Sequence, residues 1–265
     1  MERRLTGRHD STLQAENGRL ELMAESGSHG ALLLKAGDQV RTLDLSLRCD
    51  RDSELRVLIL RESSDDLTLT LSADVHSQAD LKIGLLDLEK GFMEFRGEIR
   101  LKEPGASADL YTGELVGEGA RKKNDLQVVS ETDHTFGNMH NFAVLHRAAD
   151  YDMVAAGKIV KGARGSESHQ ETRVLTLDAD HKTRVLPILY IDENEVKASH
   201  AMTVGQPDAD QMYYLESRGL SNLQAMSLLS IGYFMPVISL AGSEDLRHRL
   251  REDLERKAGL YGHQG

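Results

Sequence analysis

The sequence predicts a mainly β protein that ends in an α-helical subdomain, and three observations support this fold class. From about residue 31 to 200 apolar residues recur with a period of two: in TLDLSLRCD, Leu43, Leu45 and Leu47 alternate with polar side chains. These short runs follow one another at regular intervals, separated by Gly, Asp, Asn and Ser. After His200 the apolar period becomes helical.

The regular spacing of the predicted strands fits two architectures. One is an antiparallel sandwich or barrel, and the other is a parallel β-helix, in which each coil adds short strands to long stacked sheets. Hairpins in a sandwich favour Asn-Gly or Asp-Gly turns, and neither dipeptide occurs between the alternating runs of residues 31–200. The turn chemistry therefore favours the β-helix slightly.

The last part of the chain carries helix start signals. Asp208 and Ser221 each stand three residues before a glutamine, which is the pattern of a capping box. Ser243 can cap a third helix, in which one face is formed by Leu246, Leu250 and Leu254. We therefore divide the chain into a β-helix body, residues 1–204, and a helical subdomain, residues 205–265.

The most apolar run, residues 225–241, is shorter than the about 20 residues that a bilayer span needs. It contains Pro236, so we expect a buried helix with a kink or break, and no membrane partner. The N-terminal stretch lacks the apolar region of a secretory signal. The single cysteine, Cys49, lies on the apolar face of its strand and is expected to be an inert thiol, which predicts a reducing, cytoplasmic setting.

Charge and missing motifs exclude several functions. The net charge is −11, and such a surface repels nucleic acid, so no nucleic-acid partner is expected. The densest basic run, ARKKND at residues 120–125, is expected to be a solvated loop. The sequence contains no phosphate-binding glycine loop and no nucleophile elbow. We therefore expect a chain that neither binds nor hydrolyses ATP and is not an enzyme.

The spacing of the histidines does not predict a metal site. His134, His140 and His146 are spaced so that they share one face of an extended strand, but about 20 Å apart at each step. They cannot ligate one ion in that geometry. We expect them to be solvated or hydrogen-bonded, and we expect no cofactor in the isolated chain.

Two segments in order carry a family resemblance. In HTFGNMHNFAVLHRAADYDMVAAGKIVKGARGSESHQETRVLTL, Gly157 precedes a strand, and Gln170 and Arg173 form a Gln-x-x-Arg pattern. TRVLPILYIDENEVKASHAMTVGQPDADQMYYLESRGLS has a proline-bearing strand, an acidic turn, Ser-His, Thr-Val-Gly, an aromatic pair and Arg-Gly-Leu. The chain from about residue 128 to 260 resembles the SufB/SufD family of iron–sulfur cluster assembly proteins, and SufD more than SufB.

The resemblance implies a right-handed parallel β-helix followed by α-helices. It implies a SufD-like scaffold whose last coils form a dimer, either with a SufB-like chain or with a second copy. It also implies that the C-terminal helices dock onto a SufC-type ABC ATPase, which hydrolyses the nucleotide. An iron–sulfur cluster would then be held only transiently, in the complex.

Departures from the family pattern concern the cluster. His181 stands where SufB has the cysteine tied to cluster assembly, and Ala201 stands where SufB has a glutamate. Full-length SufD has an N-terminal helical region, whereas this sequence begins almost directly with strands, so a short member is expected. His200 matches the SufD histidine at the dimer interface, where an imidazole can ligate iron or relay a proton.

The candidate site residues follow from this resemblance. His200 and His181 are predicted near the cluster or interface, with a purely structural hydrogen-bonded role as the alternative. Tyr213, Tyr214 and Leu215 are expected to pack the helices onto the end of the β-helix. The predicted ATPase contact lies within residues 208–258, and its apolar surface is formed by Met226, Leu228, Leu229 and Tyr233.

Two other functions remain open on the sequence. One is a cytoplasmic β-helix protein that binds or cleaves a small acidic or sugar ligand, because Asp and Glu are abundant. The other is a purely structural homodimer that has lost assembly function, which the missing cysteine and glutamate would explain.

Overall fold

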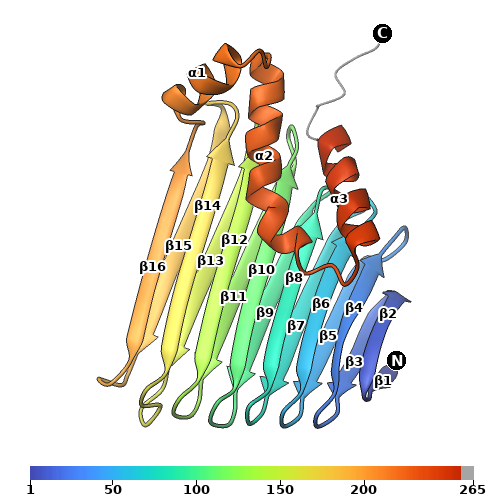
Figure 1. Cartoon of the computed structure of the whole chain (residues 1–265), viewed down its shortest axis with the longest axis vertical. Helices are drawn as coiled ribbons and strands as arrows, with labels where there is room; N and C mark the ends of the chain where they lie inside the picture. The colour runs from blue at the N-terminus through green and yellow to red at the C-terminus, as the bar shows by residue number, and fades with distance from the viewer. Residues whose placement is uncertain (258–265) are drawn as a thin grey trace.

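The computed structural model describes residues 1–257, which form a parallel β-helix followed by helices packed on one of its faces (Figure 1). These residues contain sixteen strands and three helices. Successive strands alternate between two parallel sheets of eight strands each, so every coil contributes one strand to each sheet. This topology confirms the predicted fold class and excludes the antiparallel sandwich, because no strand pairs with its neighbour in sequence.

The two sheets are formed by the odd-numbered and the even-numbered strands. The odd sheet contains β1 (Glu2–Leu5), β3 (Gly18–Ala24), β5 (Thr42–Cys49), β7 (Leu67–Val75), β9 (Met93–Leu101), β11 (Arg121–Ser130), β13 (Ala149–Ile159) and β15 (His181–Ile191). The even sheet contains β2 (Arg8–Gln14), β4 (His29–Ala36), β6 (Glu54–Arg61), β8 (Asp80–Asp87), β10 (Ser107–Val116), β12 (Phe136–Leu145), β14 (Glu167–Thr176) and β16 (Lys197–Gly205). The helices are α1 (Ala209–Ser217), α2 (Asn222–Ile238) and α3 (Glu244–Lys257).

The core lies between the two sheets, where the inward-facing residues of every strand stack in rows. Leu43, Leu45 and Leu47 of β5 are at most 3% exposed and belong to one continuous cluster that extends to β14. Cys49 lies in the same cluster, and burial raises the pKa of its thiol to about 12. The predicted inert thiol is therefore confirmed.

The strands begin earlier than the period of two indicates. β1, β2 and β3 precede residue 31, but nearly all residues of β1 and β2 are at least partly exposed, so polar side chains on both faces hide the alternation. The dipeptide Asn17-Gly18 lies in the connection from β2 to β3. It makes no hairpin, because β2 pairs with β4 and β3 pairs with β5.

The turns from an odd to an even strand explain the regular spacing. Each of these turns, up to the one before β14, has a residue at positive φ: Gly7, Gly27, Asp52, Gln78, Gly105, His134 and Gly165, with Gly162 as a second one in the last of these turns. In the stack, the N–H of Gly27 donates to the carbonyl of Arg51 in the next turn at 3.0 Å, and that of Asp52 donates to Ser77 at 3.0 Å. The turns stay stacked although the register offset between successive coils grows from 21 residues (Arg8↔His29) to 31 residues (Phe136↔Glu167).

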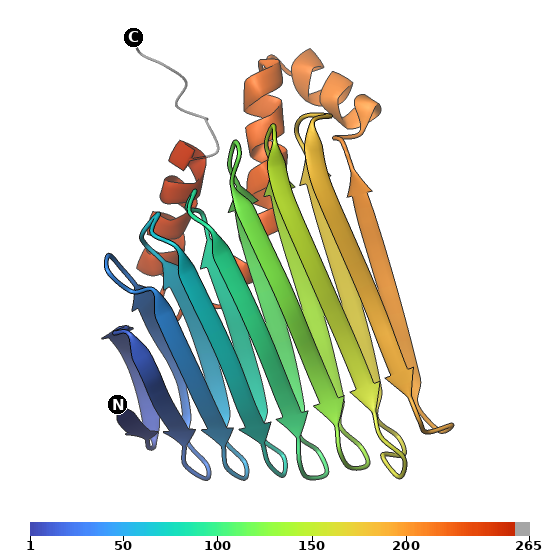
Figure 2. The same cartoon turned by 180° about the vertical axis from the view of Figure 1, so that it is seen from behind.

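The helices cover the outer face of the even sheet, and the view from behind shows no helix over the odd sheet among the residues described (Figure 2). Phe234, Val237 and Ile238 of α2 are buried against β8, β10 and β12. The approach is close at Gly113, where an added Cβ would lie 3.0 Å from Val237 and 3.1 Å from Phe234. Glycine therefore lets α2 sit on the sheet.

The predicted helix boundaries are largely confirmed. Asp208 accepts hydrogen bonds from two backbone N–H groups of α1, Ser221 and Gln224 form a complete capping box on α2, and Ser243 accepts from the Leu246 N–H. No break occurs at Pro236, because α2 continues through it to its C-cap at Ser239. Within residues 1–257 no helix has the length and apolarity to cross a bilayer.

The third helix is held by a few contacts. Leu250 and Leu254 are buried in the cluster that α2 forms with the even sheet, and Leu246 packs against it partly buried. At the end of α3, Lys257 forms an ion pair with Glu89 in the turn between β8 and β9. The turn between β8 and β9 therefore binds the end of α3.

A group of charged side chains lies inside the β-helix and includes Lys122 of β11, so the solvated loop expected at residues 120–125 is wrong. Arg61, Asp87 and Lys122 are 2%, 0% and 0% exposed. The Oδ2 atom of Asp87 accepts from Arg61 Nη1 at 2.9 Å and from Lys122 Nζ at 2.5 Å. Lys122 also donates to the carbonyl of Glu89 at 2.7 Å, and Arg61 donates to that of Gly91 at 3.1 Å. One carboxylate thus faces two cations, whose other N–H groups bind backbone carbonyls of the turn between β8 and β9 and hold that turn in place.

A second buried polar group surrounds Glu114 of β10. Its Oε2 atom accepts from Asn124 Nδ2 at 2.7 Å, while its Oε1 atom and the Tyr151 hydroxyl are buried without a hydrogen-bond partner among the described residues. Burial, and then the charge of Asp87, raise the pKa of Glu114 to about 7. An ionised Glu114 is thus costly in the folded chain.

Glu114→Gln should stabilise the protein at pH 8 relative to the unchanged chain, and much less at pH 4. The folded pKa is raised, so the favourable contribution of Glu114 is complete below the ordinary pKa and is lost as pH rises through about 7. Glutamine does not ionise and keeps an oxygen for Asn124. By linkage the gain at pH 8 is on the order of 3 kcal/mol, measured by urea unfolding at both pH values.

The matched control for this titration is Glu118→Gln, which changes an exposed carboxylate in the turn after β10. Its pKa is lowered by the adjacent Arg147, so removing the charge should give no gain at high pH. If the difference in unfolding free energy between Glu114→Gln and the unchanged chain were independent of pH, Glu114 would not titrate as described.

Candidate functional site

The last coil of the β-helix is the most exposed part of the β body. No residue of β16 is buried, whereas most residues of β14, its only partner, are buried or half-buried. The register places the row Ala198, His200, Met202 and Val204 of β16 beside the buried row Ser168, Gln170, Thr172 and Val174 of β14. Side chains that would be core in any other coil are therefore open to solvent here.

Apolar exposure is concentrated at this end. Met202 and Val204 of β16 are 49% and 41% exposed, and Leu186 and Tyr190 of β15 are 44% and 49% exposed. In β15 the residues on both faces are apolar, because Leu186 and Tyr190 alternate with the inward-facing Pro187 and Leu189. A strand with two apolar faces and a free edge is a surface that another protein can cover.

The two candidate histidines lie in this coil but on different sheets. His200 is exposed in the middle of β16, in register with Gln170, and forms no hydrogen bond within residues 1–257. His181 is the first residue of β15, in register with Ala149, and its Nδ1 atom lies 2.7 Å from Thr183 Oγ1. The structure does not bring the two side chains into one group of metal-binding geometry among the residues described.

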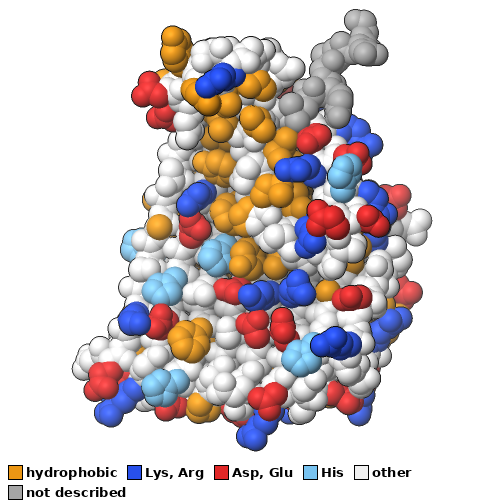
Figure 3. Space-filling view, viewed as in Figure 1, with side chains coloured by type: hydrophobic (Ala, Val, Ile, Leu, Met, Phe, Trp, Pro, Cys, Tyr) orange, Lys and Arg blue, Asp and Glu red, His pale blue; other side chains and the backbone are white. Residues whose placement is uncertain are grey.

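The predicted ATPase contact divides into exposed and packed residues. Leu228 of α2 is 47% exposed, and Figure 3 shows hydrophobic side chains gathered over α2 on this face. Leu229 and Tyr233 are half-buried against the cluster below α2. Met226 is half-buried and lines a cavity of about 240 Å³ beside His146 in the turn after β12. Only Leu228 of the four is freely exposed.

The two tyrosines of α1 do not pack onto the β-helix as expected. Tyr213 and Tyr214 are 75% and 56% exposed, and α1 has no buried residue. The guanidinium of Arg218 lies 5.2 Å from the centre of the Tyr214 ring, which is a contact within the helix end rather than with the β body. The physical reason is that α1 projects past the last coil and touches α2 rather than the sheets (Figure 1).

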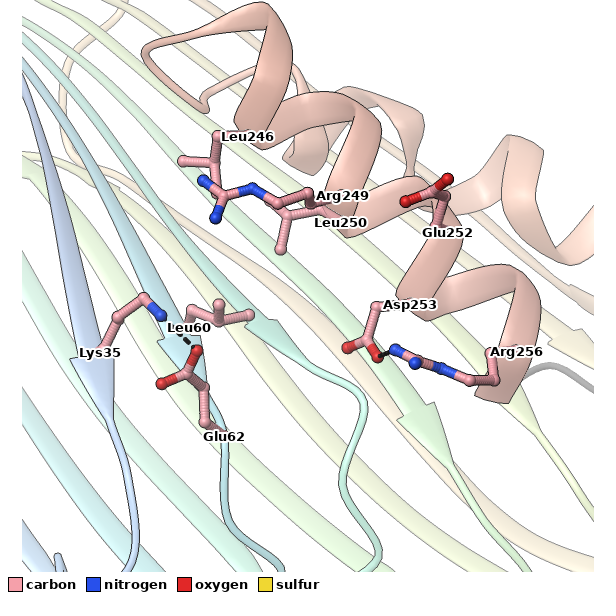
Figure 4. A pocket seen from close by; sticks show the side chains of 9 residues that line it. All are labelled: Lys35, Leu60, Glu62, Leu246, Arg249, Leu250, Glu252, Asp253 and Arg256. Atoms are coloured by element: carbon pink, nitrogen blue, oxygen red, sulfur yellow. Dashed lines mark hydrogen bonds and ion pairs between the residues drawn. The ribbon is translucent and has the colours of Figure 1, made fainter.

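An open groove of about 560 Å³ lies between α3 and the even sheet (Figure 4). Its charged side chains largely neutralise one another: Lys35 pairs with Glu62 at 2.6 Å, and Arg256 pairs with Asp253. None of the named site residues (His181, His200, Met226, Leu228, Leu229 and Tyr233) lines this groove, although its α3 residues lie within the range 208–258 predicted for the ATPase contact. The exposed last coil, rather than this groove, is therefore the candidate site.

A comparison with protein families decides the identity. A family model described as "SUF system FeS cluster assembly, SufBD core domain" matches residues 7–233. The chain belongs to the SufBD family. This result confirms the resemblance inferred from the sequence and makes the chain an iron–sulfur cluster assembly protein of the SufBD type. The family match covers the β-helix, α1 and most of α2, including the exposed last coil.

Curated relatives place this SufBD family protein near SufD. The iron–sulfur cluster assembly protein SufD of Bacillus subtilis (strain 168) is 34% identical over 144 residues, which is 54% of this chain and 33% of that protein. A SufBD family protein of Synechocystis is 24% identical over 197 residues, 72% of this chain and 43% of that protein. One of Mycobacterium leprae is 25% identical over 132 residues, 50% of this chain and 15% of that protein. The chain thus spans less than half the length of these relatives.

Several residues of this face escaped the sequence analysis. Leu186, Tyr190, Met202 and Val204 were not singled out, although a signal was present. The run VLPILYI in β15 is apolar at odd and even positions alike, while the other strands on the odd sheet alternate. A continuous apolar run in an otherwise alternating protein indicates a strand covered on both faces.

Proposed function

We propose that this SufBD family protein is a SufD-like scaffold in an iron–sulfur cluster assembly complex that works with a SufC-type ABC ATPase. The partner hydrolyses the nucleotide, and this chain is not itself an enzyme. The cluster is a transient cargo of the complex, not a resident cofactor. The setting is a reducing cytoplasm, as the single buried cysteine suggests.

The observation that carries this proposal is the uncovered last coil. Met202 and Val204 stand in rows that are core elsewhere in the β-helix, so covering them removes apolar surface from water at about 25 cal/mol per Å². Tyr190 and Leu186 add exposed apolar area on the outer face of β15. The proposed occupant is a SufB-like chain or a second copy of this chain, with His200 at the interface.

The helical subdomain supports the second partner. α1 buries none of its residues, and Leu223 and Leu228 at the start of α2 are 52% and 47% exposed. Together with Tyr213 and Tyr214 they form an apolar surface that is separate from the last coil in sequence. We name Tyr213, Tyr214, Leu223 and Leu228 the helical patch, and we assign it to the ATPase.

The test of the proposed function is the mass of the native complex purified from its host. We expect two β-helix chains together with an ATPase of the ABC type. A chain that purifies as a monomer without an ATPase would contradict the scaffold. A dimer without an ATPase would instead favour a purely structural homodimer.

Leu228→Asp should abolish capture of the ATPase and leave the dimer intact. The carboxylate stays hydrated in the free chain, because the side chain is 47% exposed, but it would be desolvated and unpaired under a partner. We expect at least a 30-fold loss of affinity, measured by titration with the ATPase. As a control, Arg251→Asp on the exposed side of α3 should bind as the unchanged chain does. Equal loss in both variants would remove the helical patch from the proposal.

A further inference from the structure

The buried carboxamide of Gln170 has an unused acceptor next to the candidate histidine. Gln170 is 3% exposed, and its Nε2 atom donates to the carbonyl of Ile188 at 2.8 Å. This bond fixes the orientation of the amide, because the reversed amide would place two oxygens face to face. The Oε1 atom is buried and has no hydrogen-bond partner among the described residues. A buried acceptor without a donor requires an explanation.

The register identifies the donor. Gln170 of β14 and His200 of β16 are Cα partners in a parallel pair, so their side chains leave the same face about 4.8 Å apart. His200 is exposed and carries no hydrogen bond of its own within the described part of the chain. Rotation of an exposed side chain takes only picoseconds to nanoseconds, so a ring N–H can reach the acceptor without moving the backbone.

The surroundings of Gln170 leave room for this bond. Gly157 of β13 faces the same spot: an added Cβ there would lie 3.0 Å from Gln170 Nε2 and 2.3 Å from Ser168 Oγ. Glycine thus keeps the amide in place. The Ser168 hydroxyl is also buried without a partner among the described residues, so this end of the core contains two polar groups whose hydrogen bonds are not made.

We propose that Gln170 is a positioning residue for His200: its Oε1 atom accepts one ring N–H of His200 and thereby selects the tautomer of the imidazole. The nitrogen that does not bond to Gln170 then keeps its lone pair and faces the open end of the β-helix. That nitrogen can accept a proton or bind a metal ion brought by the partner, because the bond made by one ring nitrogen determines what the other can do. The inference rests on the proposed function only for the identity of the partner.

The tautomer of His200 is the direct test. The whole chain is labelled with ¹⁵N histidine, and long-range ¹H–¹⁵N spectra are recorded at pH 8, with His200 assigned from a His200→Asn sample. We expect one tautomer in the unchanged chain and a mixture in Gln170→Leu. A merely structural role of Gln170 would leave the tautomer of His200 unchanged. The same tautomer ratio in the unchanged chain and in Gln170→Leu would overturn the proposal.

The matched control is Thr172→Val, which removes the next polar residue of the same buried row and faces Met202 instead of His200. It should leave the tautomer unchanged, and thermal unfolding shows whether the variants are folded. The mass of each sample reports the proposed dimer separately. A monomeric chain in which Gln170→Leu still mixes the tautomers would therefore refute the dimer and keep the positioning role.

Discussion

Asp87→Asn should lower the free energy of unfolding by about 3–5 kcal/mol, the typical cost of removing one partner from a buried ion group. Among the described residues, Asp87 is the only carboxylate within hydrogen-bond distance of Arg61 and Lys122. All three side chains are buried. Burial already lowers the pKa of Lys122. Without the carboxylate, Lys122 loses its proton or remains as an unpaired charge. Urea unfolding of the whole chain at pH 7 measures the loss.

The control for Asp87 is an ion pair of similar geometry at the surface. Asp152 binds the Arg184 guanidinium through two bonds of 2.8 Å, but Arg184 is 64% exposed. Asp152→Asn should cost no more than about 1 kcal/mol. Equal losses for the two variants would show that the interior group is not desolvated, and a loss below 1 kcal/mol for Asp87→Asn would show that its charges are not coupled.

Met202→Asp should weaken association of the two β-helix chains by at least about 100-fold, because burying an unpaired carboxylate costs several kcal/mol. In the separate chain the substitution is tolerated, since Met202 is 49% exposed at the edge of the even sheet. Sedimentation velocity over a range of concentrations measures the association.

Leu223→Asp is the counterpart on the helical patch, with a similar exposure of 52%. It should leave sedimentation unchanged. The two variants, together with Leu228→Asp, separate the two proposed contacts: the last coil governs the dimer and the helical patch governs ATPase capture. A dimer that survives Met202→Asp but dissociates with Leu223→Asp would exchange the two assignments.

The fold could be predicted because every coil of a β-helix repeats the same pattern of alternating apolar and polar residues and the same kind of turn. Rows such as Leu43, Leu45 and Leu47 alternate with polar residues, and the turns between coils need residues that accept positive φ. The helix caps at Asp208, Ser221 and Ser243 were equally readable, since capping is a local interaction. The alternation of apolar and polar residues did not predict β1 and β2, because both faces of these strands are exposed to water.

The candidate site could be predicted only in part, because it depends on contacts across coils. The sequence placed His200 near the join of strands and helices, but not beside Gln170, which is 30 residues earlier and becomes a neighbour through the register. The exposure of Tyr213 and Tyr214 also escaped prediction. Aromatic residues at a helix usually indicate packing, and only the course of α1 past the last coil shows that nothing within residues 1–257 covers them.

The position of the interior charges has a genetic consequence. Arg61 and Lys122 hold the backbone of the turn between β8 and β9, and Glu89 in that turn anchors Lys257 at the end of α3. We therefore expect a substitution inside the β-helix to displace α3, which lies on the outer face of the even sheet. A random screen for variants that lose functions of the α-helices should return mutations at the buried Arg61 and Lys122 as well as on the helices themselves.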